Sequence, residues 1–186
     1  SAFSTEWLGR LAAYRVSDRP RAPLEVALAV LDTLVADSDG QGPRLLRATT
    51  ALSTLGLSFS DDEAEALLRT DGFSQRSAIA ALEQLVELGV LTEPSTTLLQ
   101  FSHPLVHTAA QVRLPSERAR AHFDVVARQR AAQPGRDPRL AAHALAASGR
   151  LEDAVALLAE AARGALEAFD ALRVEHLLDG CGHILD

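Results

Sequence analysis

Two histidines in the segment "QFSHPLVHTAAQ" (100–111) have a spacing that could support metal chemistry. His103 and His107 are four residues apart, which can place two zinc ligands on one helical face. The HExxH pattern of zinc proteases would need glutamate at 104, where Pro104 stands. Because proline favours the first turn of a helix, His103 is expected just outside the helix that contains His107. We therefore expect structural roles for both histidines, with a small metal site as the alternative.

The same segment predicts a helix cap. The first N–H groups of a helix beginning at Pro104 lack partners within the helix, and either Ser102 or His103 could accept a hydrogen bond from one of them. Further along, His122 and Asp124 are too common a combination to indicate acid–base catalysis. We predict no catalytic residue, no cofactor-binding residue and no metal ligand in this chain.

An arginine-rich segment follows, "RLPSERARAHFDVVARQR" (113–130), with five arginines and only two acids. One interpretation is a solvated helix face. The other is a surface that contacts an acidic patch or a nucleotide phosphate of another domain. The residues considered for such an interdomain contact are Arg113, Arg118, Arg120 and Arg128.

The composition of the 186 residues excludes several classes of chemistry. All 18 basic residues are arginine, so this chain holds neither a phosphate-binding GKS/GKT loop nor a Schiff-base lysine. The formal net charge of −7 is unusual for a nucleic-acid binder, which is more often basic. A hydrophobic content of 47% predicts a packed core, and no apolar run is long enough to cross a membrane.

Two further features of the composition concern the origin of the chain. The single cysteine, Cys181, allows no internal disulfide and fits a cytoplasmic location. The sequence contains no methionine, so we expect a piece of a longer protein.

The elements that would position these residues are almost all helical. Apolar spacing predicts helices over 5–14 and 23–36, the second with Pro23 in its first turn. The breaker "DSDGQGP" (37–43) predicts a domain boundary, so that 1–40 forms a helical segment of its own.

The next predicted domain, 41–133, begins with the order of a winged helix. A helix over 43–56 precedes a capping box, Ser60 with Glu63, which opens a helix to about 68. A helix over 74–89 follows, and two β-prone runs over 90–101 flank a Pro-Ser turn. The buried stripe expected on the helix over 74–89 consists of Ala78, Ile79, Leu82, Leu85 and Val86.

A winged helix raises direct DNA binding as an alternative function, because its third helix usually enters the major groove. Here that helix is 74–89, and the wing carries Glu93 but no arginine. The side of this helix that is expected to be exposed carries two glutamates, Glu83 and Glu87, and one arginine, Arg76. Such a surface would contact DNA phosphates poorly. The positions expected to be exposed are Gln75, Arg76, Glu83, Gln84 and Glu87.

The remaining chain is expected to continue as helices. These cover 104–113 and 117–132, and after the breaker "QPGRDP" (133–138) they cover 139–148 and 151–180. Asp137 and Pro138 predict a cap and a first-turn proline. The short link Gly149-Arg150 predicts an antiparallel helix pair within a third domain, 134–186.

The stretch "LVELGVLTEPSTTLLQFSHPLVHTAAQVRLPSERARAHFDVVA" (85–127) resembles a segment of the large ATP-binding regulators of the LuxR family, which are signal-transduction ATPases with numerous domains. That segment typically reads "FrHpL" and then "Lp..rR..lH". The matching residues here are Phe101, His103, Pro104, Leu105, Leu114, Pro115, Arg118 and His122. Ala119 departs from the pattern, because an arginine usually stands there. The resemblance covers about 43–170, where "LAAHALAASGRLEDAVALLAEAARGAL" (140–166) is similar to the start of a tetratricopeptide-like array.

The resemblance implies a mainly α fold: a helical N-terminal segment, a winged helix with a small β-hairpin, and the start of a tetratricopeptide-like array. It also implies a non-catalytic regulatory module that couples partner or ligand sensing to a nucleotide switch. Its partners would be the parent protein's own nucleotide-binding domain and a protein or small-molecule effector. ATP or ADP would bind the parent protein, and DNA would be read by a separate domain.

Overall fold

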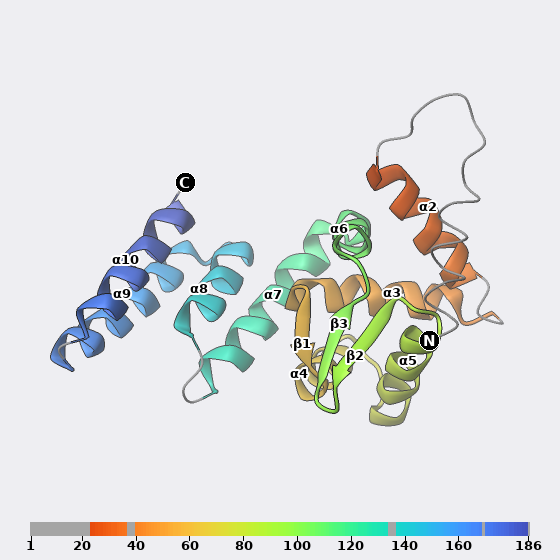
Figure 1. Ribbon diagram of the computed structural model, residues 1–186, viewed down its shortest axis with the longest axis horizontal. Helices are drawn as coiled ribbons and strands as arrows, with labels where there is room; N and C mark the ends of the chain where they lie inside the picture. Colours follow the sequence, from red (N-terminus) through yellow and green to blue (C-terminus); the bar gives the residue numbers. More distant parts are fainter. Residues whose placement is uncertain (1–22, 37–39, 134–136, 169, 186) are drawn as a thin grey trace. The chain divides into compact units, whose positions relative to one another are not determined.

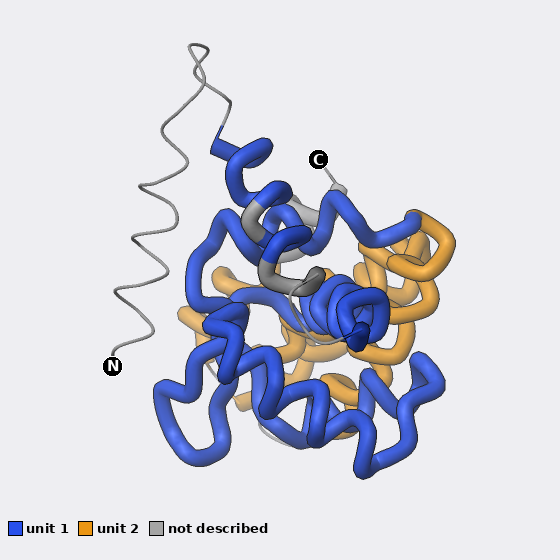
Figure 2. Tube along the Cα trace, turned by 90° about the vertical axis from the view of Figure 1, so that its right-hand side faces the viewer, with its two compact units in different colours: residues 1–115 blue, residues 116–186 orange. Residues whose placement is uncertain are grey.

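The computed structural model describes residues 23–36, 40–133, 137–168 and 170–185. It divides into two compact units, residues 1–115 and 116–186 (Figure 2). The helix expected at 5–14 lies outside the described residues. Within the first unit α2 (Pro23–Ala36) packs on α6 (Pro104–Arg113), and within the second unit α7 (Ser116–Ala131) packs on α8 (Pro138–Ala147). The domain boundaries expected near 40 and 133 stay predictions.

The first unit contains a winged helix, as the sequence order predicted. Its elements are α3 (Gly42–Leu52), the 3₁₀ turn η1 (Ser53–Leu55), β1 (Ser58–Ser60), α4 (Asp61–Thr70), α5 (Gln75–Glu87), β2 (Leu91–Ser95) and β3 (Leu98–Phe101). The sheet is antiparallel with the order β1-β3-β2 (Figure 1). The mainly α fold with a small β-hairpin is therefore confirmed, with β1 as an additional edge strand.

The apolar faces of these elements form one core. Leu45, Ala48 and Leu52 recur at helical spacing along α3 and are fully buried. Leu67 and Leu68 of α4 and Leu82 and Leu85 of α5 are also buried. On the sheet, Phe59 of β1 pairs with Leu99 of β3, and the Phe59 ring meets Phe101 edge-on at 5.9 Å. This packing fixes α5 and the wing on a common base.

Local signals explain where the helices of this unit begin. The Ser60 hydroxyl accepts from the Glu63 N–H, and the Glu63 carboxylate accepts from the Ser60 N–H, so the predicted capping box is formed. Ser74 caps α5 by accepting from Ser77 N–H. The chain reverses between these helices at Gly72, whose φ of 87° is strained for a side-chain-bearing residue.

The turn of the wing does not lie at Pro94-Ser95, where it was expected. Pro94 and Ser95 belong to β2, and the turn is formed by Thr96 and Thr97. The pairing of β2 with β3 shifts register between Thr92 and Ser95, which marks a bulge around the proline. Proline has no N–H to donate to a ladder, so an edge strand with a bulge accommodates it.

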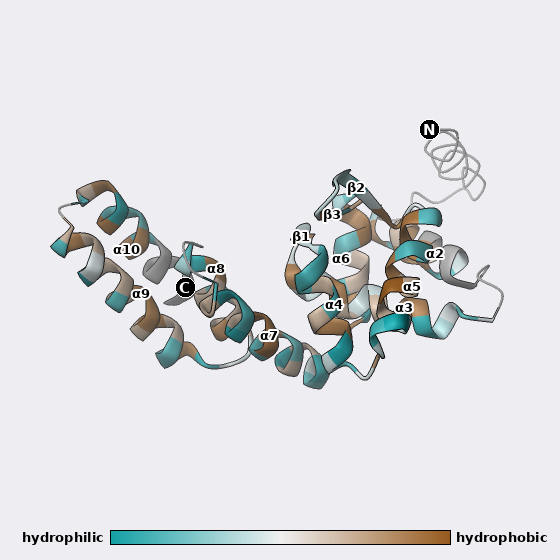
Figure 3. Ribbon diagram, turned by 90° about the horizontal axis from the view of Figure 1, so that it is seen from below, coloured by the Kyte–Doolittle hydropathy of each residue, from teal (hydrophilic) through white to brown (hydrophobic). Residues whose placement is uncertain are grey.

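The second unit consists of α7, α8, α9 (Leu151–Glu167) and α10 (Ala171–Leu185), each packed on the next. Polar and apolar stretches alternate along these helices (Figure 3). Small residues line the contacts, including Ala141 and Ala142 of α8 and Ala154 and Ala162 of α9, all buried. The predicted cap at Asp137 is formed, because its carboxylate accepts from Arg139 N–H at 3.0 Å.

The prediction of a single helix over 151–180 is wrong. Helix α9 ends at Glu167, and α10 begins at Ala171. The Asp170 carboxylate accepts from Arg173 N–H at 3.0 Å, as an N-cap does. The aspartate in "FDALR" was the signal for this new helix start. Within the described ranges, every helix is too short or too polar to span a bilayer.

Candidate functional site

The histidines of the "FSHPLVH" segment are used in contacts within the fold. His103 is the N-cap of α6, where its Nδ1 accepts from Leu105 N–H at 3.1 Å. The His107 Nε2 lies 2.9 Å from the Ser53 carbonyl oxygen, so Nε2 carries the proton in this contact. Among the described residues there is no group of three or more histidine, cysteine, aspartate or glutamate side chains able to hold a metal ion.

His107 links α6 to the end of α3. Its ring meets the Phe101 ring edge-on at 5.2 Å. Burial lowers the pKa of His107, and the hydrogen bond to the Ser53 carbonyl opposes that shift. The imidazole therefore holds two elements together as a neutral donor.

Ser102, the other candidate cap, is placed differently. Its N–H donates to the Val90 carbonyl at 3.0 Å, which ties the end of β3 to the start of the wing. Its hydroxyl oxygen is buried and has no hydrogen-bond partner among the described residues. The capping role therefore belongs to His103.

The four arginines considered for an interdomain contact fall into two groups. Arg113 pairs with Asp32, joining α6 to α2, and Arg128 pairs with Asp124 at 2.7 Å on α7. Arg118 and Arg120 are exposed on the first turns of α7 and form no ion pair with a described residue. His122, on the same helix, is buried in the core of the second unit.

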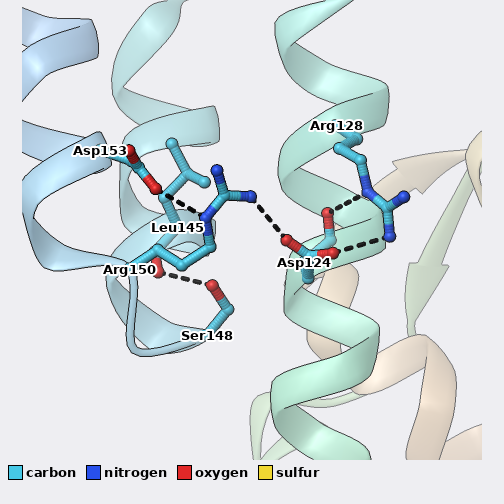
Figure 4. Close-up of polar contacts among 6 residues, drawn as sticks. All are labelled: Asp124, Arg128, Leu145, Ser148, Arg150 and Asp153. Carbon is cyan, nitrogen blue, oxygen red and sulfur yellow. Dashed lines mark hydrogen bonds and ion pairs between the residues drawn. The ribbon is translucent and has the colours of Figure 1, made fainter.

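Asp124 is the centre of an ion-pair network in the second unit (Figure 4). Its carboxylate binds Arg128 at 2.7 Å and Arg150 at 2.8 Å, and Arg150 binds Asp153 at 2.7 Å. Arg150 lies in the turn between α8 and α9, so the network joins α7 to that turn. Asp124 was considered above only together with His122, and this ion-pair network was not predicted from the sequence.

The exposed side of α5 was considered above for direct contact with DNA. Gln75, Arg76, Glu83 and Glu87 are exposed as expected, whereas Gln84 is half-buried. The expected burial of Ile79 is wrong, since this side chain is 42% exposed. Ala78, Leu82 and Leu85 already fill the side of α5 that faces the core, and Ile79 lies outside that stripe.

A cluster of two arginines around Phe73 positions α5. The guanidinium carbons of Arg44 and Arg47 lie 5.3 Å and 4.7 Å from the centre of the Phe73 ring. Arg44 donates to the Ser77 carbonyl at 2.8 Å, and Arg47 donates to the Asp71 carbonyl at 2.7 Å. These contacts between α3 and the α4–α5 turn fix the start of α5. Their separation in sequence left them unrecognised before the structure.

The fold is thus a winged helix, preceded by α2, and a separate unit of antiparallel helices. No protein-family model matches the chain, and no curated protein or solved structure matches it either. The functional conclusion therefore depends on the chain's own residues.

Proposed function

We propose that the chain is a non-catalytic regulatory and interaction module of a bacterial signal-transduction ATPase, of the kind found in LuxR-type transcriptional regulators. In this role it couples the sensing of a partner or ligand to a nucleotide switch in the cytoplasm. The observation that carries the proposal is the motif order over 85–127, in which a wing, a capped helix and an arginine-bearing helix follow one another. ATP or ADP would be bound by another domain of the parent protein.

The contacts of the histidines support a non-catalytic role for this segment. A ring that caps a helix and a ring bonded to a backbone carbonyl hold elements in place. The arginine-rich segment, 113–130, leaves Arg118 and Arg120 available for the nucleotide-binding domain of the parent. Guanidinium groups suit both carboxylates and phosphates.

The helices of the second unit support a role in receiving a partner. Helices α8 and α9 form a tight antiparallel hairpin lined by alanine, and α10 packs on α9. Hairpins of this type stack into extended binding surfaces in helical-repeat proteins. We infer that this unit is the start of a tetratricopeptide-like array that senses an effector.

Direct DNA binding through α5 is the second candidate, because the winged-helix topology exposes that helix. Charge disfavours it. Residues 42–101 contain eight acids and four arginines, and Arg44 and Arg47 are occupied around Phe73. Since phosphate neutralisation supplies much of the affinity for DNA, an acidic surface binds it poorly.

Two assays on the purified chain and the sequence of the parent gene test the proposal. We expect no ATP hydrolysis by the chain, no binding to duplex DNA at 150 mM salt, and a phosphate-binding GKS/GKT loop encoded upstream in the parent gene. ATP hydrolysis by the chain alone would contradict the non-catalytic role. DNA binding that is lost in Arg76→Glu would instead establish the second candidate.

A further inference from the structure

One side of α5 carries an apolar side chain among acidic residues. We define the α5 face as Arg76, Ile79, Ala80, Glu83 and Glu87, all exposed. Ile79 lies one turn after Arg76 and one turn before Glu83, so these positions adjoin along the helix. The opposite side of α5 is buried in the core. The α5 face is therefore a continuous strip of surface along about three turns of helix.

The charged groups of this face have no partners among the residues that the structure describes. Arg76, Glu83 and Glu87 form no ion pair with any described residue. The same is true of Glu93, an exposed residue of strand β2. The α5 face therefore holds two carboxylates and one guanidinium that form no ion pair with a described residue and can bind an external group.

The α5 face is also held in a fixed position. Ser74 caps the helix, Arg44 binds the Ser77 carbonyl, and Phe73 is enclosed by Arg44 and Arg47. Residues on a rigid helix lose less conformational entropy on binding than residues on a mobile loop. A partner would meet this surface already formed.

We propose that the α5 face docks a basic amphipathic helix of a protein partner. An apolar residue of that helix covers Ile79 and Ala80, and its arginine or lysine side chains pair with Glu83 and Glu87. The strip follows helical spacing, which matches the spacing of side chains on a second helix packed against it. The same carboxylates repel the phosphates of nucleic acid and of anionic lipid. This inference deepens the proposed interaction role and depends on it.

The test is a selection from a phage-displayed library of amphipathic helical peptides, with Leu, Ala, Arg, Glu and Gln allowed at the surface positions. The immobilised target is the complete chain. We expect enrichment of peptides with several arginines beside a leucine stripe. A synthetic copy of the strongest peptide should bind at least tenfold more weakly to Ile79→Ser. It should also bind at least tenfold more weakly to the double variant Glu83→Arg/Glu87→Arg.

The controls distinguish loss of the binding surface from loss of the folded structure. Leu57→Ser removes a side chain of matched exposure, 43% against 42%, elsewhere in the same unit, and should leave peptide affinity unchanged. Circular dichroism and thermal unfolding should match for all variants. Amide shifts of the ¹⁵N-labelled chain should change along α5 when peptide is added.

Four outcomes overturn the inference. They are enrichment of acidic or neutral peptides, equal binding to Ile79→Ser, no enrichment over a target carrying that substitution, and binding of DNA that is lost in Arg76→Glu. Because the readout is peptide binding by this chain alone, its failure is distinguishable from failure of the proposed function, which depends on a nucleotide-binding domain.

Discussion

The stacking of two guanidinium groups on Phe73 provides the sharpest test of how α5 is positioned. Phe73→Leu keeps an apolar side chain of similar size but removes the aromatic ring. Each guanidinium–ring contact at a partly exposed site contributes about 0.5–1 kcal/mol, and a shape change of this kind costs up to about 1.5 kcal/mol. We expect the unfolding free energy of the first unit to fall by about 1–3 kcal/mol.

A double-mutant cycle isolates the stacking from the change in shape. Arg47 is the closer of the two arginines, at 4.7 Å from the ring centre, with 40% of its side chain exposed. Combining Phe73→Leu with Arg47→Met should give a coupling energy of about 0.5–1 kcal/mol. The hydrogen bond from Arg47 to Asp71 is lost in both backgrounds and cancels.

The assay is native-state hydrogen exchange of the buried amides of α3 and α5, which reports on the first unit without unfolding of the second. Arg69→Met serves as the matched control, since Arg69 is exposed and pairs only loosely with Glu65 at 3.9 Å. Its coupling to Phe73→Leu should stay below about 0.5 kcal/mol. Equal couplings for Arg47 and Arg69 would refute the stacking as a source of stability.

Three other predictions concern single contacts. The stability of the first unit should decrease as pH falls below about 6.5, the unperturbed pKa of histidine. The unfolded chain then gains a proton that the folded His107, with its lowered pKa, resists. His107→Gln should flatten this slope in urea titrations between pH 5 and 8, and an unchanged slope would assign the effect to another group. Ser60→Ala should cost about 1–2 kcal/mol in hydrogen exchange of α4, because it removes the cap and a hydrogen bond of the buried Glu63; a change under about 0.3 kcal/mol would contradict the capping role. Asp124→Asn should lower the melting temperature of the second unit slightly at low salt and hardly at all in 1 M NaCl, because its ion pairs are partly exposed. A loss that persists in 1 M NaCl would mean that the contact is more than an ion pair.

The sequence predicted the helix starts well because they depend on local chemistry. Ser60, Asp137 and Pro104 each mark a helix start within a few residues, and those helices begin where expected. The third helix and the wing were also recognisable, because apolar spacing and β-prone runs are local signals.

The features that the sequence did not predict depend on tertiary packing. β1 is only three residues long, Ser-Phe-Ser, too short for an alternating pattern, and it forms because Phe59 packs opposite Leu99. Ile79 satisfies the apolar periodicity of α5, but the core is already filled by its neighbours. The enclosure of Phe73 joins residues far apart in the chain.

The candidate site was predicted only in part for the same reason. Exposed charges on α5 follow from helical spacing, whereas the exposure of Ile79 does not. The pairing of Arg128 with Asp124 has the local i, i+4 spacing, but that of Arg113 with Asp32 requires the packing of α2 on α6. Only the structure shows that Arg118 and Arg120 are exposed and form no ion pair with a described residue.

We propose above all that this chain responds to the nucleotide state of a partner domain. The most direct test of this proposal is the affinity of the chain for the nucleotide-binding domain encoded upstream in the parent gene, measured by calorimetry with ADP and with a non-hydrolysable ATP analogue. We predict a difference of at least fivefold between the two nucleotides, and weaker binding by Arg118→Glu/Arg120→Glu in at least one state. Equal affinity with both nucleotides, or an upstream region without a nucleotide-binding domain, would contradict the claim.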